Sequence, residues 1–212
     1  MEGRIASWYA RNTRDDQRFS TTAAAFAASL SAGARVLEVA PGPGYFAIAL
    51  AKKGDFRVSG LDISESFVRI ARDNGRTADV EIDFQHGNAS AMPYADESFD
   101  LVVCQAAFKN FSQPLQALDE TYRVLSPGGR AVIEDLRKEA TSKEVEAEVG
   151  SMGLSWVNAF RTRATFRWFL LKNAYTEEAI LRLVDQSRFG RGEYRREGIG
   201  FQLRLAKDQT EA

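Results

Sequence analysis

Short apolar runs alternate with longer amphipathic stretches through the first two thirds of the chain. The apolar runs, which we interpret as strands, are residues 35–40, 56–61, 99–104 and 130–136. Residues 80–85 alternate apolar with polar side chains, which predicts a further strand. The amphipathic stretches repeat their apolar positions at helical spacing, and they are residues 18–30, 45–53, 64–74 and 114–125. Strands that alternate with helices across short loops predict a parallel sheet with helices on both faces.

Three details refine this pattern. The run 99–104 is apolar throughout, so we expect this strand at the centre of the sheet. We expect Gly75 to end the helix that begins at Ser64, because glycine is common just past the end of a helix. The Pro-Gly-Gly sequence at 127–129 indicates a turn before the strand at 130–136.

The pattern changes near the carboxyl end. Residues 199–206 alternate apolar with polar or small side chains, which is typical of a half-buried strand. Residues 187–195 precede this strand across a turn at Glu197 and Gly198, so the two segments are predicted to form an antiparallel hairpin. Residues 141–186 have a mostly helical pattern, and the segment is longer than a crossover between strands requires.

Composition excludes several kinds of protein. The 212 residues fit one domain, and 28 Lys and Arg nearly balance 29 Asp and Glu, so no overall charge attracts nucleic acid. The sequence shows neither the ~20-residue apolar run of a membrane span nor the apolar run of a signal peptide at its start. With one cysteine, Cys104, and one histidine, His86, we expect no internal disulfide and no Cys/His metal site. These features predict a cytoplasmic domain without membrane insertion.

The loop at residues 40–44, Ala-Pro-Gly-Pro-Gly, lies between the first predicted strand and the next helix. Its glycines let a ligand approach the backbone, and the helix N-terminus favours negative charge, which together suit a nucleotide. The spacing of Gly42, Gly44 and Ala47 also fits the fingerprint of dinucleotide-binding proteins, so the loop alone does not identify a cofactor. The alternative is a tight turn that only packs the strand against the helix.

Asp62 ends the second predicted strand, at about the 20-residue offset expected for an acid that binds a ribose. A carboxylate there can accept hydrogen bonds from both ribose hydroxyls. The alternative is that Asp62 caps the helix that begins near Ser64.

Five blocks, in this order along the chain, extend the pattern. They are VLEVAPGPG at 36–44, GLDIS at 60–64, GNA at 87–89 with MPY at 92–94, SFDLVV at 98–103 and RVLSPGG at 123–129. With these blocks, residues 34–136 resemble the class I S-adenosylmethionine-dependent methyltransferases, and among them the branch that includes the ubiquinone and menaquinone biosynthesis methyltransferases. No single block is decisive, but the ordered set is specific.

The resemblance agrees with the pattern of strands and helices and completes the predicted α/β fold. It implies a Rossmann-like, doubly wound, mostly parallel seven-stranded sheet with a C-terminal antiparallel hairpin, N-terminal helices and a helical insertion before the last two strands. We expect residues 1–212 to form a single domain. Its parts are an N-terminal helical cover at 1–33, a cofactor-binding core at 34–136, a helical substrate-side segment at 141–186 and the hairpin at 187–208.

The resemblance also implies a cofactor, S-adenosylmethionine, which leaves as S-adenosylhomocysteine after in-line methyl transfer to a small aromatic or apolar molecule. The implied cofactor-binding residues are Tyr9, Glu38, Ala40, Gly42, Gly44, Asp62, Ile63, Asn88, Ala89 and Gln105. In this assignment Asp62 holds the ribose hydroxyls, and Ile63 packs on the adenine. The Asn88 side chain and the Ala89 amide meet polar atoms of the adenine. Gln105 lies near the methionine end, and Tyr9 closes over the cofactor.

Two residues depart from the family pattern. Ala40 stands where the family usually has glycine, and Asn88 stands where aspartate is common. We expect a negative φ at Ala40, because alanine tolerates a positive φ poorly and Pro41 restricts the residue before it. Asn88 keeps an acceptor oxygen for the adenine amine without the charge, so we expect cofactor binding to be retained.

A general base is needed only where the methyl acceptor arrives with its proton. Gln105, Lys109 and Asn110 are the candidates, because they follow the fourth strand near the expected methyl group. The alternatives are that Lys109 is merely solvated and that Asn110 caps the helix after Phe111. We do not expect His86 to be the base, since it lies at the adenine side.

Two regions rich in aromatic residues are candidates for binding the acceptor. Phe108, Lys109 and Phe111 follow the fourth strand, while Trp156 and Phe160 belong to the substrate-side segment. Aromatic walls with a few polar groups suit a flat or apolar small molecule. The same aromatic residues at helical spacing also fit a core.

Two other functions are compatible with parts of the sequence. A nicotinamide-dependent oxidoreductase would explain the glycine loop and Asp62 but not the block at 123–129, and the chain has no Tyr-x-x-x-Lys pair. A methyltransferase-like binding protein without turnover would explain Ala40 and Asn88. The identity of the acceptor, the element that is methylated and the choice between monomer and homodimer stay open.

Overall fold

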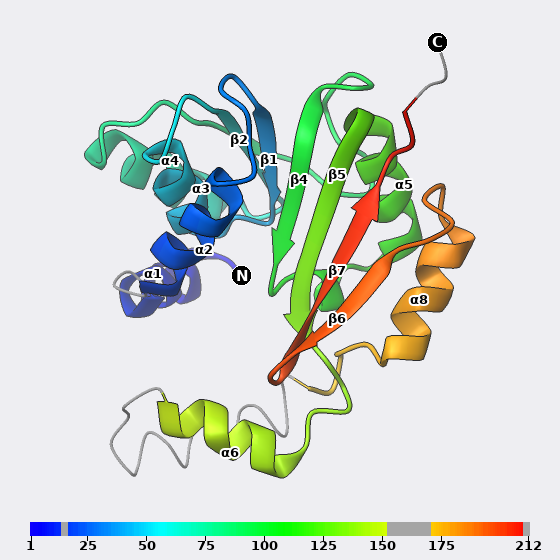
Figure 1. Ribbon diagram of the computed structural model, residues 1–212. Coiled ribbons are helices and arrows are strands. Elements are labelled where there is room, and N and C mark those ends of the chain that lie inside the picture. The colour runs from blue at the N-terminus through cyan, green and yellow to red at the C-terminus, as the bar shows by residue number, and fades with distance from the viewer. Residues whose placement is uncertain (14–16, 152–170, 210–212) are drawn as a thin grey trace.

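The computed structural model describes residues 1–13, 17–151 and 171–209. Its centre is one sheet of seven strands in the order β3-β2-β1-β4-β5-β7-β6 (Figure 1). The strands are β1 (Arg35–Val39), β2 (Arg57–Asp62), β3 (Asp83–His86), β4 (Phe99–Gln105), β5 (Leu125–Leu136), β6 (Glu193–Glu197) and β7 (Gly200–Ala206). β1 to β5 pair in parallel, whereas β7 pairs antiparallel with both β5 and β6. The predicted α/β fold is confirmed, with β4 at its centre.

Helices cover both faces of the sheet. They are α1 (Gly3–Thr13), α2 (Gln17–Ala27), α3 (Tyr45–Ala51), α4 (Glu65–Thr77), α5 (Pro114–Val124), α6 (Ser142–Ser151) and α8 (Glu177–Gln186), with a short 3-10 turn η1 (Phe108–Asn110). Figure 1 shows α1 to α4 on one side, here called the α2 side, and α5 and α8 on the other, the α5 side. α6 follows β5 and lies beyond its carboxyl end. None of the helices in the described ranges is long and apolar enough to cross a membrane.

Alternation along the central strands builds a core on each side of the sheet. In β1, Leu37 and Val39 belong to the core on the α5 side, whereas Val36 belongs to the core on the α2 side. Both cores are closed by helix residues such as Leu118 of α5 and Phe46 of α3, which are almost fully buried. Two buried faces explain why the central strands read as continuous apolar runs.

The ends of several elements differ from the predictions. α4 does not end at Gly75 but continues to Thr77, and the chain leaves the helix through Asp79 at a φ of 55°. Aspartate tolerates this left-handed conformation because its short polar side chain can bond locally. β3 begins at Asp83 rather than at residue 80, because only from Asp83 does the chain pair with β2.

β5 and β6 also begin elsewhere than predicted. β5 begins at Leu125, which pairs with Phe99, and the turn at 127–129 forms an irregularity before Arg130 pairs with Leu101. β6 begins at Glu193 rather than at Ser187, because Ser187 ends α8 and donates its hydroxyl to Val184 O at 2.7 Å. The hairpin itself turns at Gly198, as predicted.

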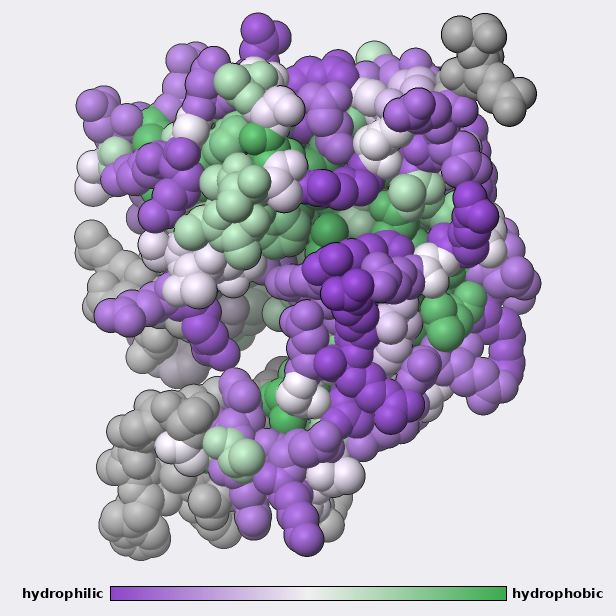
Figure 2. Space-filling view, in the orientation of Figure 1, coloured by the Kyte–Doolittle hydropathy of each residue, from purple (hydrophilic) through white to green (hydrophobic). Residues whose placement is uncertain are grey.

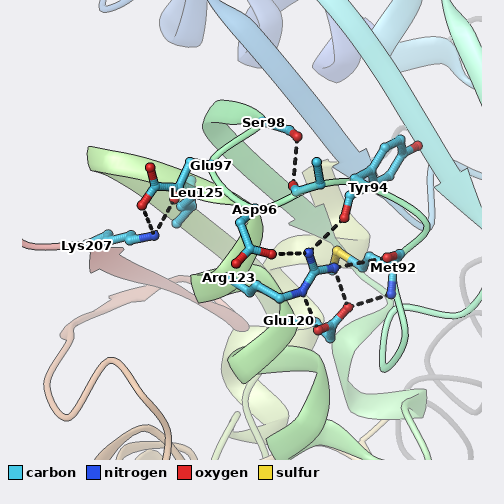
Figure 3. Close-up of polar contacts among 10 residues, drawn as sticks. Met92, Tyr94, Asp96, Glu97, Ser98, Glu120, Arg123, Leu125 and Lys207 are labelled. Atoms are coloured by element: carbon cyan, nitrogen blue, oxygen red, sulfur yellow. Dashed lines mark hydrogen bonds and ion pairs between the residues drawn. The ribbon is translucent and has the colours of Figure 1, made fainter.

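Arg123 at the end of α5 ties a long loop to the sheet (Figure 3). Its Nε and Nη2 donate to the two carboxylate oxygens of Glu120 at 2.7 and 2.8 Å. Nη2 also donates to Met92 O at 3.0 Å, while Nη1 donates to Tyr94 O at 2.7 Å and to Asp96 Oδ1 at 2.8 Å. A planar guanidinium with five N–H groups can make such a set, so Arg123 fixes the loop that carries residues 88–94.

A second arginine ties the start of β1 to the starts of β4 and β5. Arg35 donates from its backbone N and its Nε to Asp100 Oδ2 at 2.9 and 3.2 Å. Its Nη2 donates to Asp100 Oδ1 at 2.7 Å and to Ser126 Oγ at 2.6 Å. These bonds hold three strands in register at the amino edge of the sheet, away from the carboxyl edge.

Replacing Arg123 tests how much its bonds stabilise the fold. We expect Arg123→Ala to lower the free energy of unfolding by about 2–3 kcal/mol, because it leaves Glu120 and two carbonyl groups without their charged donor. The measurement is urea unfolding. The control is Arg182→Ala, which removes an exposed ion pair with Glu178 within α8 and should cost less than about 0.5 kcal/mol. Equal losses in the two variants would contradict a special role for Arg123.

Candidate active site

The strand order reverses beside β1, which places a candidate ligand site at the carboxyl edge of the sheet. The chain proceeds from β1 to β2 and β3 on one side, and from β4 to β5 on the other. In open α/β sheets, ligands bind outside the carboxyl ends of the strands at such a switch point. Glu38, the 40–44 loop, Asp62 and Gln105 all lie at or just beyond these strand ends.

The glycine loop is held tightly to its surroundings. Ala40 N donates to Leu61 O at 2.8 Å, and Gly44 N donates to Pro41 O at 3.0 Å. Gly44 has a φ of 78°, and a Cβ there would lie 2.7 Å from the ring of Phe84. Gly42 also has a positive φ, 54°, but a Cβ there would meet no atom within 4 Å. Gly44 is therefore required for packing, whereas Gly42 leaves open space beside its backbone.

The prediction of a negative φ at Ala40 is wrong, because its φ is 58°. Pro41 alone would favour an extended conformation with a negative φ at the residue before it, so the positive φ comes from the surrounding structure. The hydrogen bond from Ala40 N to Leu61 O fixes the strand end, and the chain must then turn sharply into the loop. A left-handed alanine costs about 1 kcal/mol, and such strain is common where backbone is shaped for a ligand.

The Asp62 carboxylate joins the glycine loop to the start of α4. Its Oδ2 accepts the Gly42 N–H at 3.0 Å, and its Oδ1 accepts the Ser64 N–H at 2.8 Å. The alternative that Asp62 caps α4 is wrong, because the N-cap is Ser64, whose hydroxyl accepts the Phe67 N–H. A carboxylate has about four acceptor positions, so two remain for further donors.

Glu38 is a second buried carboxylate at this edge. It is only 4 % exposed, and its Oε2 accepts the Ala47 N–H of α3 at 3.0 Å. Burial raises the pKa of Glu38 to about 8, the Ala47 N–H opposes the rise, and the nearby Asp62 carboxylate adds to it. Burial also raises the pKa of Asp62. A cation beside these two carboxyl groups would favour their ionised forms, so this edge of the sheet suits a positively charged group.

The predicted adenine side lies at the ends of β2 and β3. Ile63 is a large apolar side chain that is 68 % exposed, which suits stacking on a flat ring. His86 pairs its Nε2 with Ile63 O at 3.1 Å. Asn88 is exposed, and its Oδ1 accepts the Ser90 N–H at 2.9 Å. One lone pair of Asn88 Oδ1 and its amide N–H groups are thus still available to a ligand.

Gln105 points into a polar row that the sequence did not reveal. Its Nε2 donates to Glu134 Oε2 at 2.7 Å, and Gln202 Nε2 donates to Glu134 Oε1 at 2.8 Å. Sequence reasoning missed Glu134 and Gln202. Glu134 lies near the end of the fifth predicted strand, so its position could have marked it, but Gln202 becomes a neighbour only through the pairing of β5 with β7.

Lys109 and Asn110 lie beside this row. Lys109 is not solvated as the alternative proposed, because its Nζ donates to Asp135 Oδ1 and to Ala106 O, and its side chain is only 5 % exposed. The Asp135 carboxylate also accepts the N–H of Lys109 and of Leu136. Asn110 is exposed in η1, and it does not cap α5, whose N-cap is Gln113.

The aromatic candidates lie in different places. Phe108 is a fully buried core residue, whereas Phe111 is half-buried and packs against it with ring centroids 5.2 Å apart. Tyr175 packs against Phe108 with the two rings tilted and their centroids 5.8 Å apart. Tyr9 of α1 contacts Phe67 of α4 edge to face at 5.9 Å. Trp156 and Phe160 lie outside the described residues.

Comparisons with known proteins show the family to which the chain belongs. Residues 37–133 match the family model described as a methyltransferase domain. A demethylmenaquinone methyltransferase of Chlorobaculum parvum is 30% identical over 166 residues, which are 76% of this chain and 67% of the relative. Another, of Deinococcus radiodurans, is 41% identical over 100 residues, which are 47% of this chain and 42% of the relative. The chain thus spans less than half of the latter protein.

A solved structure shows the same fold over nearly the whole chain. It is a SAM-dependent methyltransferase from Aquifex aeolicus, with a TM-score of 0.69 at 18% identity, covering 92% of this chain and 95% of its own. The chain belongs to the class I S-adenosylmethionine-dependent methyltransferases, in the branch of the ubiquinone and menaquinone methyltransferases.

Replacing Ala40 with glycine tests the strain in the loop. We expect Ala40→Gly to raise the free energy of unfolding by about 0.5–1 kcal/mol, because the relief of a left-handed alanine exceeds the entropy lost by glycine. The measurement is urea unfolding. The control is Ala49→Gly within α3, which should lower the free energy by about 1 kcal/mol. Destabilisation by both changes would show that Ala40 is not strained.

The buried carboxyl of Glu38 predicts a pH dependence of stability. Its pKa in the folded protein, about 8, lies above the ordinary 4.5, so its stabilising contribution is complete below about pH 4.5 and is lost as the pH rises through 8. Between pH 5 and 9 the wild type should therefore lose more than about 1 kcal/mol relative to Glu38→Gln. The glutamine oxygen still accepts the Ala47 N–H. Parallel pH curves for the two proteins would show that Glu38 ionises normally.

Proposed function

We propose that this protein transfers the methyl group of S-adenosylmethionine to a small, flat, largely apolar acceptor of the quinone type. The Asp62 carboxylate carries the proposal, because it is fixed by two backbone N–H groups beside an open glycine and keeps acceptor positions for ribose hydroxyls. The class of acceptor follows the relatives, whose names specify demethylmenaquinone. The aromatic residues after β4 support the same class of acceptor.

The residues at the carboxyl edge suit the cofactor. Asp62 would hold the ribose, the exposed Ile63 would cover one face of the adenine, and Asn88 would meet its amine. Glu38 and Gln105 would surround the positively charged methionine end. When bound, S-adenosylmethionine supplies a methyl group that its sulfonium has already activated. The protein then has to hold the acceptor in line and exclude water, which requires positioning more than acid–base chemistry.

The acceptor side would begin at the end of β4. Phe111 is half-buried and can offer one aromatic wall, with Phe108 as its rigid support. Lys109 is held by Asp135, so it would contribute a fixed positive charge near an acceptor oxygen rather than a mobile base. We propose Gln105 and Asn110 as polar contacts at the same edge. Trp156 and Phe160 remain candidates for the opposite wall.

The first experiment compares ligands by their effect on thermal stability. We expect S-adenosylhomocysteine to raise the unfolding midpoint, because a ligand at 1,000 times its dissociation constant stabilises by about 4.1 kcal/mol. NADH and NADPH should cause no shift. Methyl transfer from labelled S-adenosylmethionine to a demethylated quinol then tests the acceptor. A shift with a nicotinamide alone would favour the oxidoreductase, and binding without transfer would favour a binding protein.

Asp62 offers the sharpest test of the cofactor site. We expect Asp62→Asn and Asp62→Ala to weaken S-adenosylhomocysteine binding by about 1.5–3 kcal/mol, because hydrogen bonds to a charged acceptor are lost. Asparagine retains one oxygen for a backbone N–H, so it separates ligand binding from loop stability. The measurement is titration calorimetry, with Asp55→Ala, an exposed change away from the strand ends, as the control. An unchanged affinity in both Asp62 variants would remove Asp62 from the site.

A further inference from the structure

Three polar side chains form a row across neighbouring strands on the α2 side of the sheet. Gln105 of β4 is registered opposite Glu134 of β5, and Glu134 is registered opposite Gln202 of β7. Both amides donate to the carboxylate, at 2.7 Å from Gln105 and 2.8 Å from Gln202. Figure 2 shows hydrophilic residues beside apolar ones on this face of the molecule.

The chemistry of this row fixes the orientation of each amide. A glutamine presents either its oxygen or its NH₂ group, but an ionised carboxylate only accepts hydrogen bonds. Gln105 must therefore turn its NH₂ group toward Glu134, and its Oε1 then faces away from Glu134. The orientation of the Gln202 amide is fixed as well, because its Oε1 accepts a hydrogen bond from Arg204 Nε, a group that can only donate.

The orientation of Gln105 matters because of where the row ends. Glu38 of β1 is registered opposite Val103 of β4, so Gln105 lies two residues further toward the carboxyl edge on the same side of the sheet. Glu38 and Gln105 would thus both face the methionine end of the cofactor. That end carries an ammonium and a sulfonium group besides its carboxylate, and an acceptor oxygen stabilises the two positive groups whereas an NH₂ group repels them.

We propose that Glu134 is a positioning residue that holds Gln105 with its carbonyl oxygen toward the charged amino-acid end of the cofactor, and that Gln202 holds Glu134 in turn. This inference rests on the proposed function. Glu134 itself does not touch the cofactor in this arrangement. It sets the direction of the Gln105 amide dipole, which would otherwise be free to flip.

The test compares two ligands that differ only in the amino-acid end. S-adenosylhomocysteine has this end, whereas 5′-methylthioadenosine has the same nucleoside and thioether without it. In titration calorimetry, Glu134→Gln should weaken binding of S-adenosylhomocysteine on the order of tenfold and change binding of 5′-methylthioadenosine by less than about twofold. A glutamine at 134 has nearly the same shape but lets the neighbouring amides flip.

Two controls make the result specific. Glu193→Gln removes an exposed carboxylate from the same side of the sheet and should leave both affinities unchanged. In a Gln105→Leu background, Glu134→Gln should have no further effect on S-adenosylhomocysteine, because its action passes through Gln105. Gln202→Leu is the second variant if Glu134→Gln does not fold, and it should weaken S-adenosylhomocysteine binding about threefold while sparing the other ligand.

The possible outcomes separate this inference from the proposed function. If wild-type protein binds neither ligand, the proposed function fails and the inference fails with it. If wild type binds both, equal weakening of the two ligands by Glu134→Gln would show a merely structural role. An unchanged affinity for S-adenosylhomocysteine, or a full effect in the Gln105→Leu background, would also overturn the assignment.

Discussion

The two hydrogen bonds to the Asp62 carboxylate are the contacts on which the site depends. They join Gly42 of the loop after β1 to Ser64 at the start of α4, so one side chain fixes both walls of the carboxyl edge. The loop can then hold Ala40 in a left-handed conformation that would be unfavourable in isolation. Asp62 also keeps acceptor positions beyond these two bonds, so one carboxylate can serve both the structure and the proposed ribose contact.

The buried charged groups at the carboxyl edge also suit a positively charged ligand. Burial raises the pKa of both Glu38 and Asp62, and the nearby Asp62 carboxylate raises the pKa of Glu38 further because like charges repel. Lys109, the buried cation in this region, is already paired with Asp135. A ligand that brings positive charge would relieve the two carboxylates, and a cofactor with a sulfonium and an ammonium group does so.

The sequence blocks that mark the family serve two different purposes. The blocks at 36–44 and 60–64 end at the carboxyl edge, where the ligand would bind. Others hold the sheet together at a distance from it: Arg35 binds Asp100 and Ser126, and Arg123 fixes the loop at residues 88–94. This second group also positions part of the predicted site, because the loop that Arg123 holds carries the predicted adenine contacts.

The sequence by itself determined the alternation of strands and helices, the central place of β4, the hairpin and the location of Asp62 at the end of β2. These follow from local spacing, since a buried strand or a glycine turn leaves its mark within a few residues. Only the tertiary structure decided the φ of Ala40, the burial of Lys109 and the row of Gln105, Glu134 and Gln202. Each depends on partners far away in the chain, and the register between strands brings those partners together.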